Sequence, residues 1–368
     1  MIRLVLFCIM TLPIIRSQCI HSQIQRHVFR GIEFYLKRDD QLRSPLAGLE
    51  GNKARKFRYL ESRLMGEAGP AVPQTLVSMG GGQSNALVAL SKLAKASNRE
   101  LVYATRPLPK WLKDNPVGNF RIALDNKARI LEVEGKVYDR LLGSNGAPTV
   151  VRELVDSDDS SGLSWEWIPQ GGGCEDAAVG LRQLAGELVA FIDNEEEEKE
   201  GGKDGEKWEV VVEAGTGATA YYLWRAMREL VAGGALEGRV VVLAAPCVGD
   251  DAYCQSLLCA LARQDDSDVN VNDYKLFSRG LQVLPTHNSP PSVFAQPYQR
   301  HLDLWKELCH ATGGDGHFDT VYAPRAWELL LDYVSTRCDG RKIIYVHCGA
   351  AYSNRTQLAR YRRMQQQQ

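Results

Sequence analysis

Short β-rich runs alternate with amphipathic helical stretches along the chain after Glu33. The strand-like runs are 33–37, 75–78, 100–104, 129–133, 209–212, 239–244 and 342–346, and the longer helical patterns include 86–96, 177–191 and 219–232. Regular alternation of this kind predicts an α/β fold, in which parallel sheets are flanked by helices on both faces.

Three polar segments fall outside this pattern. Residues 156–162 are rich in Ser and Asp, and residues 194–207 form an acidic run that contains glycines. Because such segments cannot bury enough apolar surface to join a core, we expect both to be solvated loops. The glutamine-rich end, residues 364–368, is expected to be a tail.

The first 32 residues contain four arginines and no Asp or Glu, and residues 4–15 are apolar. The apolar run is too short to span a bilayer, and an acid-free segment with arginines is typical of a targeting peptide. We therefore expect residues 1–32 to be a leader for an organelle, either the mitochondrion or the plastid. Secretory entry, or a misassigned start and a cytoplasmic location, are the alternatives.

Composition narrows the class of protein. The chain has 368 residues, of which 44% are hydrophobic and 24% charged, enough for one large or two mid-sized domains. With 44 Lys and Arg against 45 Asp and Glu, it has no basic field for nucleic acid or an anionic membrane. Its nine cysteines form no C-x-x-C pair, so we expect neither a metal site nor a disulfide framework. A small-molecule partner is the expectation that remains.

The sharpest local pattern is a buried run, 208–214, followed by a glycine-rich turn and a helix. The turn is Gly215, Thr216, Gly217, Ala218 and Thr219. Backbone N–H groups at the start of a helix suit a phosphate, although a tight turn with nothing bound is the plainer alternative. The following strand ends without a carboxylate, which disfavours NAD, and the absence of G-K-[ST] disfavours a Walker-type site.

Two further glycine loops precede helices. The loop at 78–85 offers backbone donors together with Ser84 and Asn85, a combination that fits a carboxylate as well as a phosphate. The loop at 170–176 either contacts a ligand or only caps its helix.

Lys53 follows Gly-Asn at the start of an amphipathic helix. The field of the helix N-terminus and local desolvation would lower its pKa, and a neutral lysine can form a Schiff base. The basic run 53–56 could instead be a solvated helix face. A reactive amine, a phosphate loop and a carboxylate loop together are what pyridoxal phosphate chemistry requires.

These motifs resemble the family of pyridoxal-phosphate enzymes that contains D-cysteine desulfhydrases and 1-aminocyclopropane-1-carboxylate (ACC) deaminases. The matching segments, in order, are LKRDD (36–40), GNKARK (51–56), QSN (83–85), NPVGN (115–119), QGGG (170–173), AGTGAT (214–219), YAPRAW (322–327) and HCG (347–349). They span nearly the whole chain after about residue 30.

The resemblance implies the two-domain tryptophan-synthase-β-like fold, called fold type II. The large domain would be 33–56 plus 168–363 and the small domain 57–167, with pyridoxal 5'-phosphate between them. It also implies a homodimer that acts on a small amino acid.

The resemblance also implies roles for single residues. Lys53 would form the Schiff base, Asn85 would lie against the cofactor's ring hydroxyl or the substrate, and Ser84 would contact the substrate carboxylate. The loop 215–219 would hold the phosphate. Tyr322, and with it Tyr298, would lie over the active site, unless either is an ordinary packed aromatic.

One departure bears on the reaction. At the position of Ala323, ACC deaminases carry a glutamate that hydrogen-bonds the pyridine nitrogen of the cofactor. In this sequence Cys348 is the candidate substitute for that glutamate, although a thiol is a weak donor. A weaker electron sink favours elimination of a good leaving group over ring opening. We therefore expect a D-cysteine desulfhydrase-like lyase that yields pyruvate, ammonia and sulfide. ACC deaminase and a non-catalytic pyridoxal-phosphate-binding protein are the alternatives.

Overall fold

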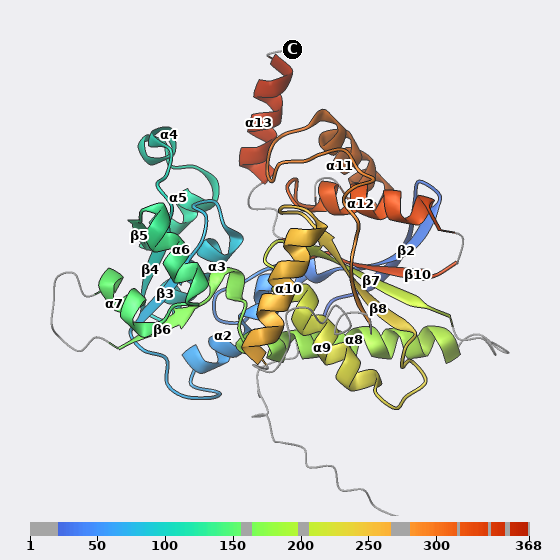
Figure 1. Ribbon diagram of the computed structural model, residues 1–368, viewed down its shortest axis with the longest axis horizontal. Helices are drawn as coiled ribbons and strands as arrows, with labels where there is room; N and C mark the ends of the chain where they lie inside the picture. Colours follow the sequence, from blue (N-terminus) through green and yellow to red (C-terminus); the bar gives the residue numbers. More distant parts are fainter. Residues whose placement is uncertain are drawn as a thin grey trace, which may run out of the picture.

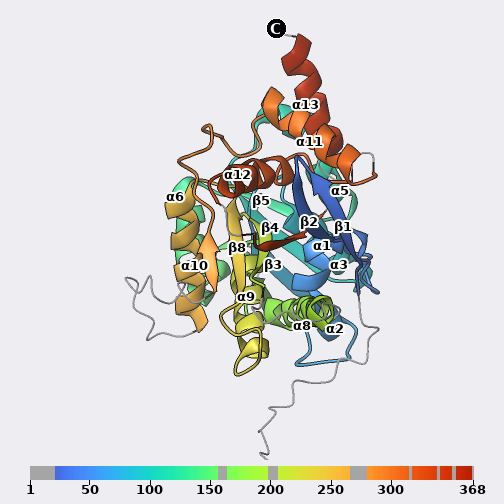
Figure 2. The same ribbon diagram turned by 90° about the vertical axis from the view of Figure 1, so that its right-hand side faces the viewer.

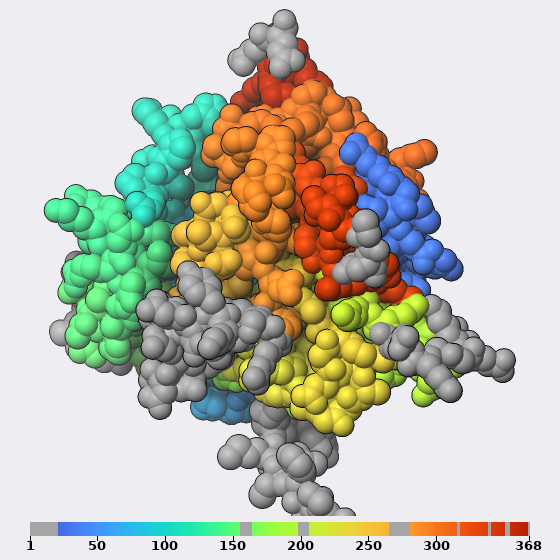
Figure 3. Space-filling model, turned by 45° about the vertical axis from the view of Figure 1, so that its right-hand side comes forward, coloured from blue at the N-terminus to red at the C-terminus, as the bar shows by residue number. Residues whose placement is uncertain are grey.

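The computed structural model describes residues 21–155, 164–197, 206–265, 280–314, 317–337, 340–349 and 354–366. Within these ranges the chain forms two β-sheets, each covered by helices, and the two layered units lie next to one another (Figure 1). In the space-filling view, the blue-green and green surface of the smaller unit adjoins the yellow and orange surface of the larger one (Figure 3).

The larger sheet has six strands in the order β1-β2-β10-β7-β8-β9. Their bounds are β1 (Ile24–Phe29), β2 (Ile32–Lys37), β7 (Trp208–Ala214), β8 (Val240–Pro246), β9 (Leu281–Val283) and β10 (Lys342–Val346). β1 runs antiparallel to β2, and the other pairs are parallel. β7 is buried along its whole length, as expected of a central strand with helices on both faces.

Successive residues of β7 serve two separate cores because side chains alternate across a strand. Val210 and Val212 pack toward α8 (Asp176–Glu197), α9 (Ala218–Val231) and α10 (Asp251–Asp265). Val211 packs toward α11 (Gln299–Ala311) and α12 (Ala323–Ser335). Turned by 90°, the sheet lies between α12 above and α8 and α9 below (Figure 2).

The smaller sheet is fully parallel, in the order β5-β4-β3-β6. Its strands are β3 (Thr75–Met79), β4 (Glu100–Thr105), β5 (Arg129–Glu132) and β6 (Trp165–Ile168). One face packs against α2 (Arg58–Leu64), α3 (Asn85–Ala96) and α5 (Gly118–Asp125), and the other against α6 (Gly135–Gly143) and α7 (Pro148–Val155).

Five short or peripheral elements complete the described chain. They are η1 (Asp39–Gln41), α1 (Gly51–Lys56), α4 (Lys110–Asp114), η2 (Gln170–Gly172) and α13 (Asn354–Gln366). Among the described residues, no helix combines the length and apolar character that crossing a bilayer requires.

All seven strands and the three helices expected from the sequence are present, so the predicted α/β class is confirmed. β1 corrects the expected extent of the leader, 1–32. It pairs with β2 from Ile24 opposite Lys37 to Phe29 opposite Ile32, so this stretch belongs to the sheet. Residues 1–20 lie outside the described residues.

Two of the polar segments are more ordered than expected. α8 continues through residues 194–197 of the expected loop 194–207, because Glu195 accepts a hydrogen bond from the Tyr35 hydroxyl at 2.5 Å and Glu196 pairs with Arg239. α13 runs to Gln366, which takes in most of the expected tail, 364–368. The expected loop 156–162 lies outside the described residues.

Candidate active site

A cavity of about 1450 Å³ lies where loops from both sheets meet. Its walls include the segments that follow β3, β6, β7 and β10, which are the carboxyl ends of parallel strands. Ligands of open α/β folds bind at this edge of a sheet. The predicted site residues that line the cavity are Lys53, Ser84, Asn85, Gly215, Thr216, Gly217, Ala218, Thr219, Tyr322 and Cys348.

Helix α1, which carries Lys53, is held against the end of β10 by its backbone. The Asn52 N–H donates to the Cys348 carbonyl at 2.8 Å. Gly51 has a φ of +59°, and a Cβ there would lie 2.1 Å from the same carbonyl oxygen. Only glycine tolerates both this conformation and this approach, so the Gly-Asn-Lys order places Lys53 on the cavity wall.

The amine of Lys53 lies beside that of Lys56, which also lines the cavity and is only 4% exposed. Burial, reinforced by the neighbouring Lys56 charge, lowers the pKa of Lys53 well below its ordinary value. Burial also lowers the pKa of Lys56 to about 8. The direction expected for Lys53 is therefore present, but its second cause is Lys56 rather than the field of a helix terminus.

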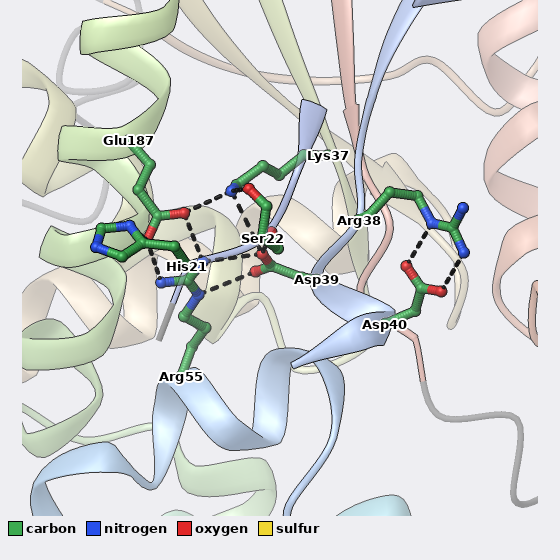
Figure 4. Close-up of polar contacts among 8 residues, drawn as sticks. All are labelled: His21, Ser22, Lys37, Arg38, Asp39, Asp40, Arg55 and Glu187. Carbon is green, nitrogen blue, oxygen red and sulfur yellow. Dashed lines mark hydrogen bonds and ion pairs between the residues drawn. The ribbon is translucent and has the colours of Figure 1, made fainter. Parts of the chain in front are cut away.

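A buried charge cluster of Lys37, Asp39, Arg55 and Glu187 anchors the other side of α1 (Figure 4). Arg55 donates to Asp39 at 2.9 Å and to Glu187 at 2.7 Å, and Lys37 pairs with Glu187 and donates to the Ser22 carbonyl at 2.6 Å. The cluster joins β2, η1, α1 and α8. The helix bearing Lys53 is thus fixed both by charge pairing and by the end of β10.

The glycine loop between β7 and α9 leaves backbone donors available. Gly217 is the N-cap residue of α9 with a φ of +75°, and no side chain from the described part of the chain caps the helix. The first N–H groups of an α-helix have no partner within the helix, so this 14-residue helix presents donors to the cavity. A phosphate fits this arrangement.

The opposite wall carries Ser84 and Asn85 at the start of α3. Ser84 Oγ accepts a hydrogen bond from the Ala86 N–H at 3.1 Å, and its hydroxyl hydrogen remains a possible donor to a ligand. Asn85 Oδ1 accepts from Asn119 Nδ2 at 2.8 Å, which directs the Asn85 amide group. Asn119 is fully buried, and sequence reasoning gave it no role although it lies in a matching segment.

The two predicted tyrosines differ in their position relative to the cavity. Tyr322 lines the cavity, where its ring packs against Gly215, and burial raises its pKa so that the phenol stays neutral. Tyr298 is not among the described residues of the cavity wall. Its hydroxyl accepts from the Val293 N–H at 3.0 Å and its ring contacts His301. The structure therefore gives Tyr298 the role of a packed aromatic at the start of α11.

The wall near Cys348 holds two carboxyl groups that sequence reasoning missed. Glu213 and Asp319 both line the cavity and are 7% and 3% exposed. Burial, then the charge of Glu213, raises the pKa of the Cys348 thiol, so Cys348 is a neutral donor at most. The available signal for Glu213 was a carboxylate at the end of an apolar strand, two residues before the glycine loop.

Taken together, the wall offers an amine whose pKa is lowered by burial, backbone N–H donors at the start of α9 for an anionic group, and polar side chains opposite them. Such a site can condense with an aldehyde that carries a phosphate tail. Within the described ranges, no three His, Cys, Asp or Glu side chains gather as they would around a metal ion.

Solved structures with the same fold are enzymes of low sequence identity to this chain. A structure described as an ACC deaminase homologue has a TM-score of 0.65 at 19% identity, over 94% of this chain and 95% of its own. A hydrogen sulfide-producing enzyme from Fusobacterium nucleatum has a TM-score of 0.52 at 11% identity, over 90% and 96%. Serine racemase from Dictyostelium discoideum has a TM-score of 0.53 at 13% identity, over 89% and 92%.

These likenesses confirm the expected fold, the two-domain tryptophan-synthase-β-like architecture of fold type II. No family pattern and no curated protein matches the sequence.

Proposed function

We propose that this chain is a pyridoxal-phosphate-dependent lyase that eliminates sulfide from D-cysteine, yielding pyruvate and ammonia. The observation that carries the proposal is the Lys53 amine, whose pKa is lowered by burial, in one cavity with the uncapped start of α9. The activities named for the structural neighbours, which include an ACC deaminase homologue and a hydrogen sulfide-producing enzyme, support the same general class.

The residues of the cavity fit this cofactor. Lys53 supplies an amine for the aldehyde, and the N–H groups of loop 215–219 take the phosphate. Lys56 adds a partly protonated amine to the same wall, since its pKa is about 8. Bound there, pyridoxal phosphate would supply an electron sink for the bond that breaks at the substrate Cα.

The protein's own contribution is to place and move a proton. Burial lowers the pKa of Lys53 Nζ, which favours the neutral amine that can accept the Cα proton of the substrate. Ser84 and Asn85 line the same cavity from the start of α3 and would orient the substrate carboxylate. Tyr322 stays a neutral phenol that can donate a hydrogen bond but carries no charge.

The runner-up is ACC deaminase, which the named neighbour at a TM-score of 0.65 favours. Sulfide leaves cysteine readily once the Cα proton is removed, whereas opening an unactivated ring demands stronger delocalisation. Ala323 in place of a glutamate therefore supports elimination, provided that no other carboxyl group binds the ring nitrogen.

The test is incubation of the cofactor-loaded protein with D-cysteine, L-cysteine and ACC in parallel. We expect sulfide and pyruvate in equal amounts from D-cysteine, loss of both in Lys53→Ala, and retention in Tyr298→Phe, the matched aromatic control outside the cavity. Formation of 2-oxobutyrate from ACC alone would transfer the assignment to ACC deaminase. Cofactor binding with no product from any of the three would support a non-catalytic carrier.

A further inference from the structure

Ala323 leaves the pyridine nitrogen of the proposed cofactor without a carboxylate from the usual position. Its methyl group is fully buried at the start of α12 and is not part of the cavity wall formed by the described residues. Any partner for the ring nitrogen must therefore come from another element of the wall.

Glu213 is in a position to be that partner. It lies near the end of β7, and the alternation along the strand turns it to the same face as Val211, toward α12. Its side chain lines the cavity, and the Tyr345 hydroxyl donates to Oε1 at 2.8 Å. Among the described residues, the side-chain hydrogen bond of Glu213 comes from Tyr345 and engages Oε1, which leaves Oε2 to serve a ligand.

The two other candidates on this wall are less suitable. Asp319 accepts backbone N–H bonds from Val321, Tyr322 and Ala323, at 2.9, 2.5 and 3.3 Å, which commits both of its oxygens to the start of α12. Cys348 offers only a thiol, and a thiol is a weak donor. Among the described residues of the wall, only Glu213 combines a carboxyl group with an uncommitted oxygen.

We propose that Glu213 is the residue that binds and protonates the pyridine nitrogen, in place of the glutamate that Ala323 lacks. The proton passes from the Glu213 carboxyl oxygen to the ring nitrogen, which leaves a carboxylate hydrogen-bonded to a pyridinium. No other reactant is needed. This inference rests on the proposed cofactor but not on the proposed substrate.

The electrostatics of the wall agree with this role. Burial, and then the negative charge of Asp319, raise the pKa of Glu213 well above its ordinary value. Both causes favour the protonated form of this carboxyl group. A cation in contact with it would favour its ionised form, as a pyridinium would do.

One consequence concerns the choice of reaction. With a carboxylate on the ring nitrogen, the electron sink is as strong as in a protein with glutamate at the Ala323 position. Ala323 then ceases to separate elimination from ring opening, and the products formed from D-cysteine and ACC must decide between them.

The test is ¹⁵N NMR of the protein loaded with pyridoxal phosphate labelled at the ring nitrogen, recorded without substrate. We expect the wild-type signal at the position of a protonated pyridine and, in Glu213→Gln, a shift to that of a neutral pyridine. Cys348→Ala should leave the signal unchanged. Because the readout needs no turnover, it stands even if D-cysteine is not the substrate.

Other results of the same experiment would overturn the proposed role of Glu213. A neutral ring nitrogen in the wild-type protein overturns the proposal without any variant, which covers the case that Glu213→Gln does not fold. A protonated nitrogen that persists in Glu213→Gln, or that is lost in Cys348→Ala or Asp319→Asn while Glu213 is intact, assigns the role elsewhere. A protein that takes up no cofactor overturns the proposed function and this inference with it.

Discussion

Replacing Asp39 by asparagine should destabilise the protein because it unbalances the buried charge cluster behind Lys53. Asp39 is fully buried and accepts two hydrogen bonds from Arg55, at 2.9 and 3.1 Å. Its Oδ1 also lies 4.0 Å from Lys37 Nζ. The asparagine keeps the shape of the side chain but leaves two positive charges to share the single carboxylate of Glu187.

The size of this loss of stability follows from the burial of the two positive partners of Asp39. Arg55 and Lys37 are each 1% exposed, so water cannot solvate the excess charge. Removing one member of a buried pair costs about 3–5 kcal/mol. That cost raises the unfolded-to-folded ratio about a hundredfold or more, at 1.4 kcal/mol for each factor of ten.

A matched control is Glu33→Gln on β2, the strand that precedes Asp39 in the chain. Glu33 pairs with Arg26 at the surface, where the side chains are 46% and 65% exposed, and such pairs contribute about 0–1 kcal/mol. The assay is urea unfolding at pH 7, followed by circular dichroism, for the wild-type protein and both variants. If Asp39→Asn lies within about 1 kcal/mol of wild type, or Glu33→Gln is equally damaging, the reasoning about burial is wrong.

Acid should weaken the same cluster. Burial opposes ionisation of Glu187, but the hydrogen bonds and charges of Arg55 and Lys37 outweigh it and hold the pKa of Glu187 below its ordinary value. A carboxylate with a lowered folded-state pKa contributes stability above its unfolded pKa and loses it as the pH falls through the folded value. This contribution to the free energy of unfolding should therefore decline below about pH 4.5.

Two further substitutions test separate features. Gly51→Ala should lower the free energy of unfolding, measured in urea melts, by about 1–3 kcal/mol more than Gly48→Ala does. Both glycines have a φ of +59°, but of these two only Gly51 has a carbonyl oxygen 2.1 Å from the added carbon. Equal losses in the two variants would refute the packing argument. Burial lowers the pKa of His347 from 6.5 to about 4, so acid between these values favours the unfolded chain. His347→Asn should remove about 3 kcal/mol of that pH dependence, and an unchanged profile would contradict the assignment.

The sequence was sufficient where local pattern and chemistry coincide. The sequence of β7 predicts a strand because most of its seven residues are apolar, and the structure buries all seven. Lys53 comes two residues after Gly51, where the structure requires a left-handed φ. The order of the glycine loops along the chain likewise matched their meeting at one edge of the sheets.

The sequence was insufficient where a distant partner decides the outcome. β1 mixes polar and apolar residues at the edge of a sheet, so its acid-free composition read as a leader. Glu195 extends α8 because Tyr35, 160 residues away in sequence, donates to it. Glu213 shows why sites are hardest to predict: only the assembled sheet reveals that its carboxyl group faces the same cavity as Lys53.

The most direct test of the central claim is reductive trapping with borohydride after addition of pyridoxal phosphate, followed by peptide mapping. The account predicts a pyridoxyl label on Lys53, retained in Lys56→Ala and absent in Lys53→Ala. A label on Lys56 in the wild-type protein, or at any other lysine, would contradict it, as would a protein that stays unlabelled with the cofactor in excess.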